Sequence, residues 1–305
     1  MPAQSFYLKL ETKLLKGVVK IKIAVLGTEN IGGLFAKKFS EGGFSIYLWD
    51  RDLENAKDLS DKIGADVFQN PWTAIERADA AISILPDENI FLEIVSQMRR
   101  SDGLLFINST TISPKISKAS SERLKDLGIC YVEAQVLGGA RDINDGSAVF
   151  LIAGENNCVR YSRLVLSNIG SIIEVGEEAY KAIVAKLAIG SAYLSSILTL
   201  SEAINLAKVY GIEESIIKKI CDKTPLSSLL QHYFNRIASV GQEAYLEMNS
   251  ASNILEYASR AAFDVGFILP TIRAAGQLFK EAEIHGYGGK DFLRILDYIN
   301  PKEKS

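Results

Sequence analysis

The first half of the chain alternates short apolar runs with longer segments of helical periodicity. The apolar runs lie at 21–26, 45–49, 78–85, 103–107, 128–134 and 147–154. Runs of this length between helical segments are typical of strands that are buried on both faces. They predict a mainly parallel sheet covered by helices.

After residue 178 the strand signals stop and helical patterns take over. These patterns lie at 180–210, 213–221, 226–237, 251–266 and 270–285, with a short helix after Gly289. The first of them carries no charge between Lys186 and Glu202, so most of its circumference must be buried. We therefore expect an N-terminal extension at 1–20, a sheet domain at 21–178 and an all-helical domain at 179–305, joined by a long interdomain helix.

Charge and hydropathy exclude several classes of protein. The chain has 34 Lys and Arg against 37 Asp and Glu, for a formal net charge of -3, which argues against a nucleic-acid partner. Residues 1–20 carry lysines throughout, unlike a secretory leader. The uncharged stretch at 187–201 is shorter than the ~20 apolar residues of a membrane span, so we expect no membrane partner.

The cysteines and histidines show no metal-binding spacing. Cys130, Cys158 and Cys221 are isolated, and the two histidines lie far apart in the sequence. We expect no metal site and, from isolated thiols, a reducing compartment. Together with the missing leader, this predicts a cytoplasmic protein.

A glycine turn follows the first predicted strand and precedes a helix. Its residues are candidates for binding a dinucleotide, whose pyrophosphate lies at a helix N-terminus in such turns: Gly27, Thr28, Glu29, Asn30, Ile31 and Gly32. The usual pattern is G-x-G-x-x-G, and Glu29 occupies the middle glycine. Its carboxylate must point away from the phosphates or be offset by a cation. The alternative is an ordinary turn between a strand and a helix.

The end of the second predicted strand favours the cofactor interpretation. Asp50 lies 18 residues beyond Gly32, close to the ~20 expected for an acid that binds the adenosine ribose. An aspartate there favours NAD, whereas Arg51 could pair with a 2′-phosphate and favour NADP. Because Asp52 also repels a phosphate, the prediction leans slightly to NAD. The fold expected for the first domain is a Rossmann-type, doubly wound α/β domain.

Further motifs follow in a fixed order. They are Leu85-Pro86, the segment Thr110 to Pro114 (T-T-I-S-P), the segment Glu133 to Gly139 (E-A-Q-V-L-G-G) and the segment Ala185 to Gly190 (A-K-L-A-I-G). Together with the glycine turn and Trp49-Asp50-Arg51, this order resembles the β-hydroxyacid dehydrogenases. That family includes 3-hydroxyisobutyrate dehydrogenase and tartronate semialdehyde reductase, with imine reductases as relatives, and the resemblance covers 21–300.

The resemblance implies roles for particular residues. Lys186 would be the catalytic general acid and base, and its place on an apolar helix would lower its pKa by desolvation. The alternative is a lysine that extends to solvent from a helix end. The implied cofactor contacts outside the turn come from Leu85, Pro86, Thr111 and Asn253. The implied substrate residues are Leu137, Gly138, Gly139 and Gly190, and Arg141 is a further candidate because it follows the glycine pair.

Polar residues at three places of the family pattern are replaced in this chain. Leu137 stands where the family has a serine, Gly190 stands for an asparagine, and Asn253-Ile254 stands for a lysine–aspartate pair. A pocket without these groups should reject small 3-hydroxy acids, because each unmade polar contact costs ~1–3 kcal/mol. Arg141 could bind a substrate carboxylate instead, or it could be a surface arginine, and the glycine pair could be an ordinary turn.

These observations favour an NAD(P)-dependent oxidoreductase. It would transfer a hydride between the nicotinamide and a small hydroxy or carbonyl compound, such as an aldehyde or a semialdehyde. One alternative is imine reduction, although imine-reducing relatives usually lack the lysine that this chain retains. Another is a catalytically silent cofactor-binding sensor or interaction protein. The apolar interdomain helix would be hard to cover within one subunit, so we expect a homodimer.

Overall fold

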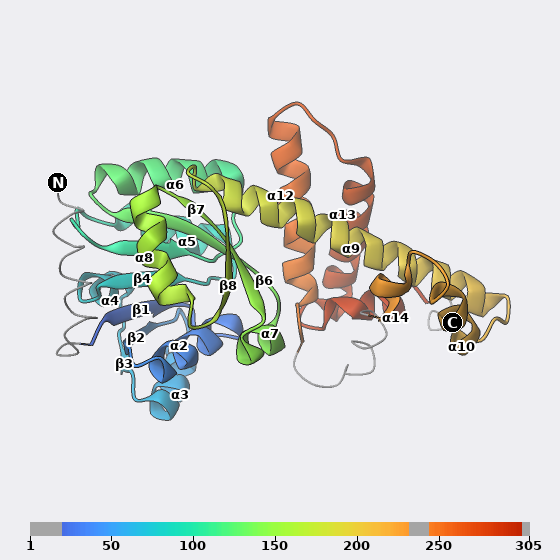
Figure 1. Cartoon of the computed structure of the whole chain (residues 1–305), viewed down its shortest axis with the longest axis horizontal. Helices are drawn as coiled ribbons and strands as arrows, with labels where there is room; N and C mark the ends of the chain where they lie inside the picture. The colour runs from blue at the N-terminus through green and yellow to red at the C-terminus, as the bar shows by residue number, and fades with distance from the viewer. Residues whose placement is uncertain (1–19, 232–243, 301–305) are drawn as a thin grey trace. The chain divides into compact units, whose positions relative to one another are not determined.

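The computed structural model describes residues 20–231 and 244–300 (Figure 1). Almost all of the expected N-terminal extension therefore lies outside the described residues. The chain divides into two compact units, and the boundary along the sequence falls between Lys186 and Leu187. The described part of the first unit contains one sheet of eight strands: β1 (Lys22–Leu26), β2 (Ser45–Trp49), β3 (Asp66–Val67), β4 (Ala80–Ser83), β5 (Leu105–Asn108), β6 (Cys130–Leu137), β7 (Ala148–Gly154) and β8 (Gly170–Gly176).

The sheet confirms the doubly wound prediction. Its strand order is β3-β2-β1-β4-β5-β6-β7-β8, and its strands pair in parallel except for β6 with β7. The order from β3 to β6 is that of a dinucleotide-binding domain, in which the chain changes direction between β1 and β4. The sequence pattern did not anticipate β3 and β8. Both are edge strands with half-exposed residues, so neither forms a continuous apolar run.

Helices cover both faces of the sheet because the strand residues alternate between them. Ile23 and Val25 face α2 (Ile31–Glu41), α3 (Leu53–Ile63), α7 (Ala140–Asp145) and α8 (Asn156–Leu166). Ala24 and Leu26 face α4 (Pro71–Glu76), α5 (Glu88–Gln97) and α6 (Pro114–Asp126). Side chains of period two on a parallel sheet produce this three-layer arrangement.

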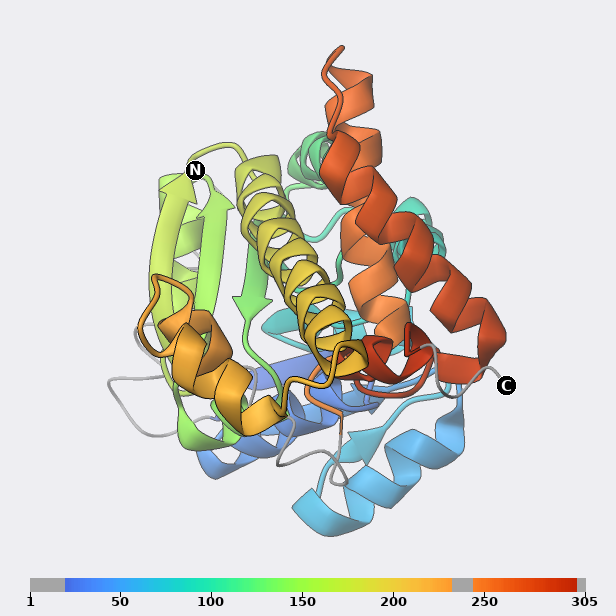
Figure 2. The same ribbon diagram turned by 90° about the vertical axis from the view of Figure 1, so that its right-hand side faces the viewer.

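The second unit is helical, as expected from the sequence. After the C-terminal part of α9 (Tyr180–Val209), it contains α10 (Glu214–Cys221), α12 (Met248–Asp264), α13 (Pro270–Ala282) and α14 (Ile295–Tyr298). Figure 2 shows α12 and α13 side by side. The backbone leaves the α-helical conformation after α13, in a π-helical turn at Glu283–Tyr287 and a 3-10 turn at Phe292–Arg294. The expected helix at 226–237 lies partly outside the described residues.

Helix α9 is long and strongly apolar. It has 30 residues, and its most apolar window has a mean hydropathy of 1.6. By length and composition alone it could cross a membrane. Half of that window is buried inside the protein, and core helices commonly have such a composition. The absence of a membrane partner stays a prediction.

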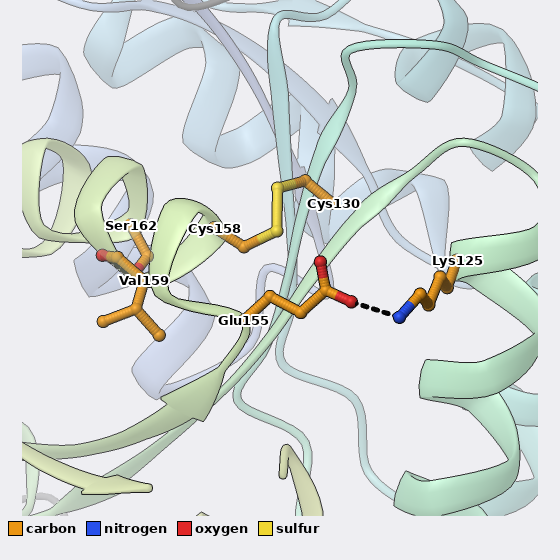
Figure 3. The surroundings of a disulfide bond; sticks show 6 residues. All are labelled: Lys125, Cys130, Glu155, Cys158, Val159 and Ser162. Carbon is orange, nitrogen blue, oxygen red and sulfur yellow. Dashed lines mark hydrogen bonds and ion pairs between the residues drawn. A yellow bond between two sulfur atoms is a disulfide. The ribbon is translucent and has the colours of Figure 1, made fainter. Parts of the chain in front are cut away.

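The prediction of isolated cysteines was wrong for two of the three. Cys130 at the start of β6 and Cys158 in α8 form a disulfide, although 28 positions separate them in the sequence (Figure 3). Packing of α8 on β6 brings the two thiols together, and spacing along the sequence carries no record of such packing. Disulfides are rare in reducing compartments. The cytoplasmic location therefore stays a prediction that the cysteines no longer support.

The disulfide should stabilise the first unit. Closing a loop of this length removes conformational entropy from the unfolded chain worth about 3–4 kcal/mol. We expect the double variant Cys130→Ala/Cys158→Ala to lose about that much free energy of unfolding in urea denaturation. Cys221→Ser is the control, because Cys221 is the free cysteine of the described residues. Equal stability of the oxidised protein and the double variant would contradict this expectation.

Candidate cofactor and catalytic site

The glycine turn lies at the carboxyl end of β1, where the sheet changes direction. A Cβ atom on Gly27, whose φ is +94°, would lie 2.1 Å from the carbonyl oxygen of Ile84. A Cβ atom on Gly32 would lie 2.1 Å from the carbonyl oxygen of Gly27. Only glycine fits at either position, so β1, β4 and the start of α2 approach one another closely. In a dinucleotide-binding fingerprint, the first glycine permits the tight turn and the last glycine permits close packing of the helix on the strand.

Glu29 points away from the start of α2. Its Oε1 atom accepts a hydrogen bond of 2.8 Å from Nδ2 of Asn55 on α3, at an exposed position. The sequence allowed a carboxylate that points away from the phosphates or one that is offset by a cation. The structure has the carboxylate that points away. The N-terminus of α2, which begins at Ile31 after Asn30, keeps its positive dipole end for an anion.

Asp50 holds the glycine turn in place. Its Oδ2 atom accepts from the backbone N–H of Thr28 at 2.7 Å and from the Thr28 hydroxyl at 2.8 Å, while Oδ1 accepts from the backbone N–H of Asp52 at 3.0 Å. Both carboxylate oxygens are thus engaged within the protein. The structure gives Asp50 a role in shaping the turn, and ribose binding by Asp50 stays a prediction.

A small cavity lies next to Asp50 and Arg51. It has a volume of about 230 Å³, and its walls include Trp49, Pro71, Trp72 and Ile90. Arg51 forms an ion pair of 2.8 Å with Glu93, which also lines the cavity. Apolar walls next to the acidic end of β2 suit a flat heterocycle attached to a sugar.

Polar side chains connect the carboxyl ends of β4, β5 and β6. The Thr110 hydroxyl accepts from the backbone N–H of Leu85 at 3.0 Å. Asn108 accepts from the Ser83 hydroxyl at 2.8 Å and from the backbone N–H of Thr110 at 3.0 Å. These bonds position the predicted cofactor residues Leu85 and Thr111 at one edge of the sheet, and Pro86 follows at an exposed position.

Lys186 lies in the second turn of α9 and is buried, with 8% of its surface exposed. Its Nζ atom donates to Oγ1 of Thr111 at 2.8 Å and to Oε1 of Gln135 at 3.1 Å. It therefore does not extend to solvent. Burial lowers the pKa of Lys186 to about 8, although the nearby charge of Glu133 partly opposes this. An amine with such a pKa can donate or accept a proton near neutral pH.

The predicted substrate loop after β6 makes contacts of its own. The backbone N–H of Gly139 donates to Oδ2 of Asp142 at 2.8 Å, so a carboxylate of the protein already occupies it. This contact is that of an ordinary turn before α7. Arg141 is exposed and pairs with Asp145 at 3.5 Å. Leu137 and Gly138 are half-buried at the end of β6.

Two predicted residues lie in the second unit, where they belong to adjacent helices. A Cβ atom on Gly190 of α9 would lie 3.3 Å from Cγ2 of Ile254 on α12. Gly190 and Ile254 both replace polar groups of the resembled family. Here the small residue makes room for the apolar one, so the two helices pack closely at this point. Asn253 precedes Ile254 and is half-buried.

Sequence reasoning singled out Thr111 but missed two other residues close to Lys186. It cited Glu133 and Gln135 only as counterparts of family positions, yet both are fully buried on β6. Two polar residues at i and i+2 of an apolar strand share one face, and this pattern could have indicated a buried polar network. Among residues 20–231 and 244–300, no group of three or more His, Cys, Asp and Glu side chains could hold a metal ion.

The residues present fit a nicotinamide dinucleotide. A Cβ atom at Gly27 or Gly32 would fill the turn, and the N-terminus of α2 faces it. The small cavity beside Asp50 has both polar and apolar walls. The pyrophosphate would bind at the turn, and the adenosine would bind in the cavity. Thr111 and Lys186 would lie at the reactive end.

Comparison with known proteins supports this fit. Residues 22–178 match the family described as the NAD binding domain of 6-phosphogluconate dehydrogenase. The chain is 22% identical to rat mitochondrial 3-hydroxyisobutyrate dehydrogenase, over 93% of this chain and 88% of the relative. It is 26% identical to the uncharacterized oxidoreductase YfjR of Bacillus subtilis, over 92% of this chain and 100% of the relative.

A solved structure has the same fold. The 3-hydroxyisobutyrate dehydrogenase of Mycobacterium tuberculosis superposes with a TM-score of 0.77 at 19% identity, covering 92% of this chain and 99% of that one. The family match spans more than half of the chain, and the full-length relatives are dehydrogenases and reductases. The chain therefore belongs to the family of the 6-phosphogluconate dehydrogenase NAD-binding domain and is an NAD(P)-dependent oxidoreductase of the 3-hydroxyisobutyrate dehydrogenase type.

Proposed function

We propose that the protein interconverts a small carbonyl compound and its alcohol, with Lys186 as the general acid and base. The observation that carries this proposal is the buried Lys186 ammonium, held by Thr111 and Gln135 at the carboxyl edge of the sheet. When bound, the nicotinamide supplies or accepts the hydride. The role of the lysine is then to donate or accept the proton.

The geometry of the ammonium group suits this task. A lysine ammonium has three N–H donors, and Thr111 and Gln135 take two of them. The third can donate to a substrate oxygen. In the direction of reduction, the ammonium gives its proton to the developing alkoxide. In the direction of oxidation, the neutral amine removes the hydroxyl proton.

The substrate is proposed to be larger or less polar than a small 3-hydroxy acid. Leu137 ends β6 where the resembled family has a serine, and the Gly139 N–H is already bonded to Asp142. Both features weaken binding of a substrate carboxylate in this loop. Aldehydes with apolar substituents are therefore the first candidates, and a semialdehyde would have to bind its carboxylate outside this loop.

The pH dependence should report the state of Lys186. Because the pKa of Lys186 is lowered to about 8, kcat/KM for reduction should be constant below that pH and fall above it. For oxidation, kcat/KM should rise with pH up to about 8 and then level off. Lys186→Ala should lower kcat by about 10²–10⁴-fold in steady-state assays.

Lys181→Ala is the matched control for this experiment, because Lys181 lies on the same helix but is only partly buried and pairs with Glu178. Unchanged turnover in Lys186→Ala would refute the role of the lysine. Turnover of an imine but not of the matching carbonyl compound would favour imine reduction. Cofactor binding without any turnover would favour the silent-binder alternative.

We propose NAD as the preferred cofactor. Asp50, Asp52 and Glu93 surround Arg51 with negative charge, and Arg51 is already paired with Glu93. A 2′-phosphate would have to compete with Glu93 for the guanidinium and approach the two aspartates. Like charges at this range disfavour the phosphate.

Removing the competing carboxylate should shift the preference. Glu93→Gln is expected to raise kcat/KM for NADPH relative to NADH by about tenfold, because Arg51 becomes available to a phosphate. Glu54→Gln is the control, since Glu54 forms a comparable exposed pair with Lys57. A wild-type preference for NADPH, or no change in Glu93→Gln, would contradict this assignment.

We propose that the protein is a homodimer whose interface includes the turn between α12 and α13. Phe263, Val265, Phe267 and Ile268 in this region are between 60% and 80% exposed. Contiguous exposed apolar side chains of this kind mark interaction surfaces. A second copy of the chain is the partner that is always present.

Light scattering should therefore give twice the chain mass of 33.4 kDa. The variant Phe263→Asp/Phe267→Asp should become monomeric, because two charges would have to be buried at the interface. Leu164→Asp on α8 is the control, since Leu164 is a less exposed leucine of the first unit. A monomeric wild-type protein at assay concentration would refute the proposal.

A further inference from the structure

Strand β6 carries a row of polar side chains on one face. Tyr131, Glu133 and Gln135 alternate along the strand, and all three are buried. Side chains two residues apart on a strand point to the same side. An apolar sheet thus contains a connected polar layer that ends at Lys186.

Four hydrogen bonds surround the Glu133 carboxylate. Its Oε1 atom accepts from Nδ2 of Asn108 at 2.5 Å and from Nε2 of Gln135 at 2.6 Å. Its Oε2 atom accepts from the hydroxyls of Ser117 at 2.5 Å and Tyr131 at 2.7 Å. A buried carboxylate is held firmly when all its lone pairs have donors.

The orientation of the Gln135 amide follows from these contacts. Its Nε2 atom donates to Glu133 and also to the carbonyl oxygen of Thr110 at 3.0 Å. Both N–H groups of the amide therefore face acceptors. Its Oε1 atom is left to face the opposite side, where it accepts from Lys186 at 3.1 Å. Rotating the amide by 180° would put N–H groups against the ammonium and an oxygen against the carboxylate.

We propose that Gln135 is a positioning residue for Lys186, and that Glu133 fixes the Gln135 amide for this purpose. The proposal deepens the proposed function and rests on it. Gln135 and Thr111 together aim the third N–H of the ammonium at the substrate oxygen.

The charge of Glu133 also affects the pKa of Lys186. The titratable groups that face Glu133 are Tyr131 from β6 and Lys186 from α9, while Asn108 from β5, Ser117 from α6 and Gln135 are neutral. Burial raises the pKa of Glu133 to about 7 despite its four donors. When ionised, Glu133 raises the pKa of Lys186 against the effect of burial. The ammonium form needed for reduction is thereby favoured near neutral pH.

Two substitutions separate positioning from packing. Glu133→Gln keeps the shape and removes the charge, and Gln135→Met keeps the length of the side chain and removes the acceptor. Both should lower the pKa of Lys186 by on the order of 1 pH unit. In Gln135→Met, kcat for reduction should fall about tenfold while KM for the cofactor is unchanged, because only the proton donor is misplaced.

The pKa of Lys186 can be measured without turnover, by NMR titration of protein labelled with 13C at lysine Cε. The resonance is assigned by its absence in Lys186→Met. Ser109→Ala is the matched control, since the Ser109 hydroxyl donates to the Ala134 carbonyl on the same strand at 2.6 Å. We expect this variant to lose stability with no change in the pKa of Lys186.

An unchanged pKa in a folded Gln135→Met variant would overturn the proposal, and this variant decides alone if Glu133→Gln does not fold. Failure of the proposed function is a separate result. A wild-type protein that turns over no carbonyl compound would refute that function, whereas the titration would still show whether Gln135 and Glu133 control Lys186.

Discussion

The candidate site depends on keeping a lysine ammonium buried. Desolvation penalises the charge, and this penalty has to be offset by acceptors that are already in place. Thr111 from the loop after β5 and Gln135 from β6 provide them, and Glu133 provides an opposing charge behind Gln135. The result is an amine with a pKa of about 8, suited to proton transfer in either direction.

The sheet topology brings these groups together. Parallel strands β4, β5 and β6 end at the same edge of the sheet, and β7 pairs antiparallel with β6 on its other side. On the other side of the reversal point, Asp50 fixes the glycine turn through Thr28. The glycine turn and the proposed proton donor thus lie at neighbouring strand ends of one sheet, where the doubly wound fold places ligand sites.

Much of this arrangement could be predicted from the sequence, because local patterns encode it. The run at 21–26, the glycines at Gly27 and Gly32 and the following helix form one continuous signal, and Lys186 interrupts an apolar helix. The pairing of Cys130 with Cys158 and the contact of Gln135 with Lys186 join segments that are distant in the sequence. Edge strand β8 was not predicted, because its residues are half exposed and form no continuous apolar run. Only packing reveals such features.

The central claim is that this protein transfers a hydride while Lys186 handles the proton. It is tested most directly by incubating the protein with NADH deuterated at either face of C4 and a panel of aldehydes and semialdehydes, followed by mass spectrometry of the products. The account predicts one deuterium on the former carbonyl carbon of a product, from one face of the cofactor, and its near absence with Lys186→Ala. Tight NADH and NADPH binding with no deuterated product from any compound would contradict it.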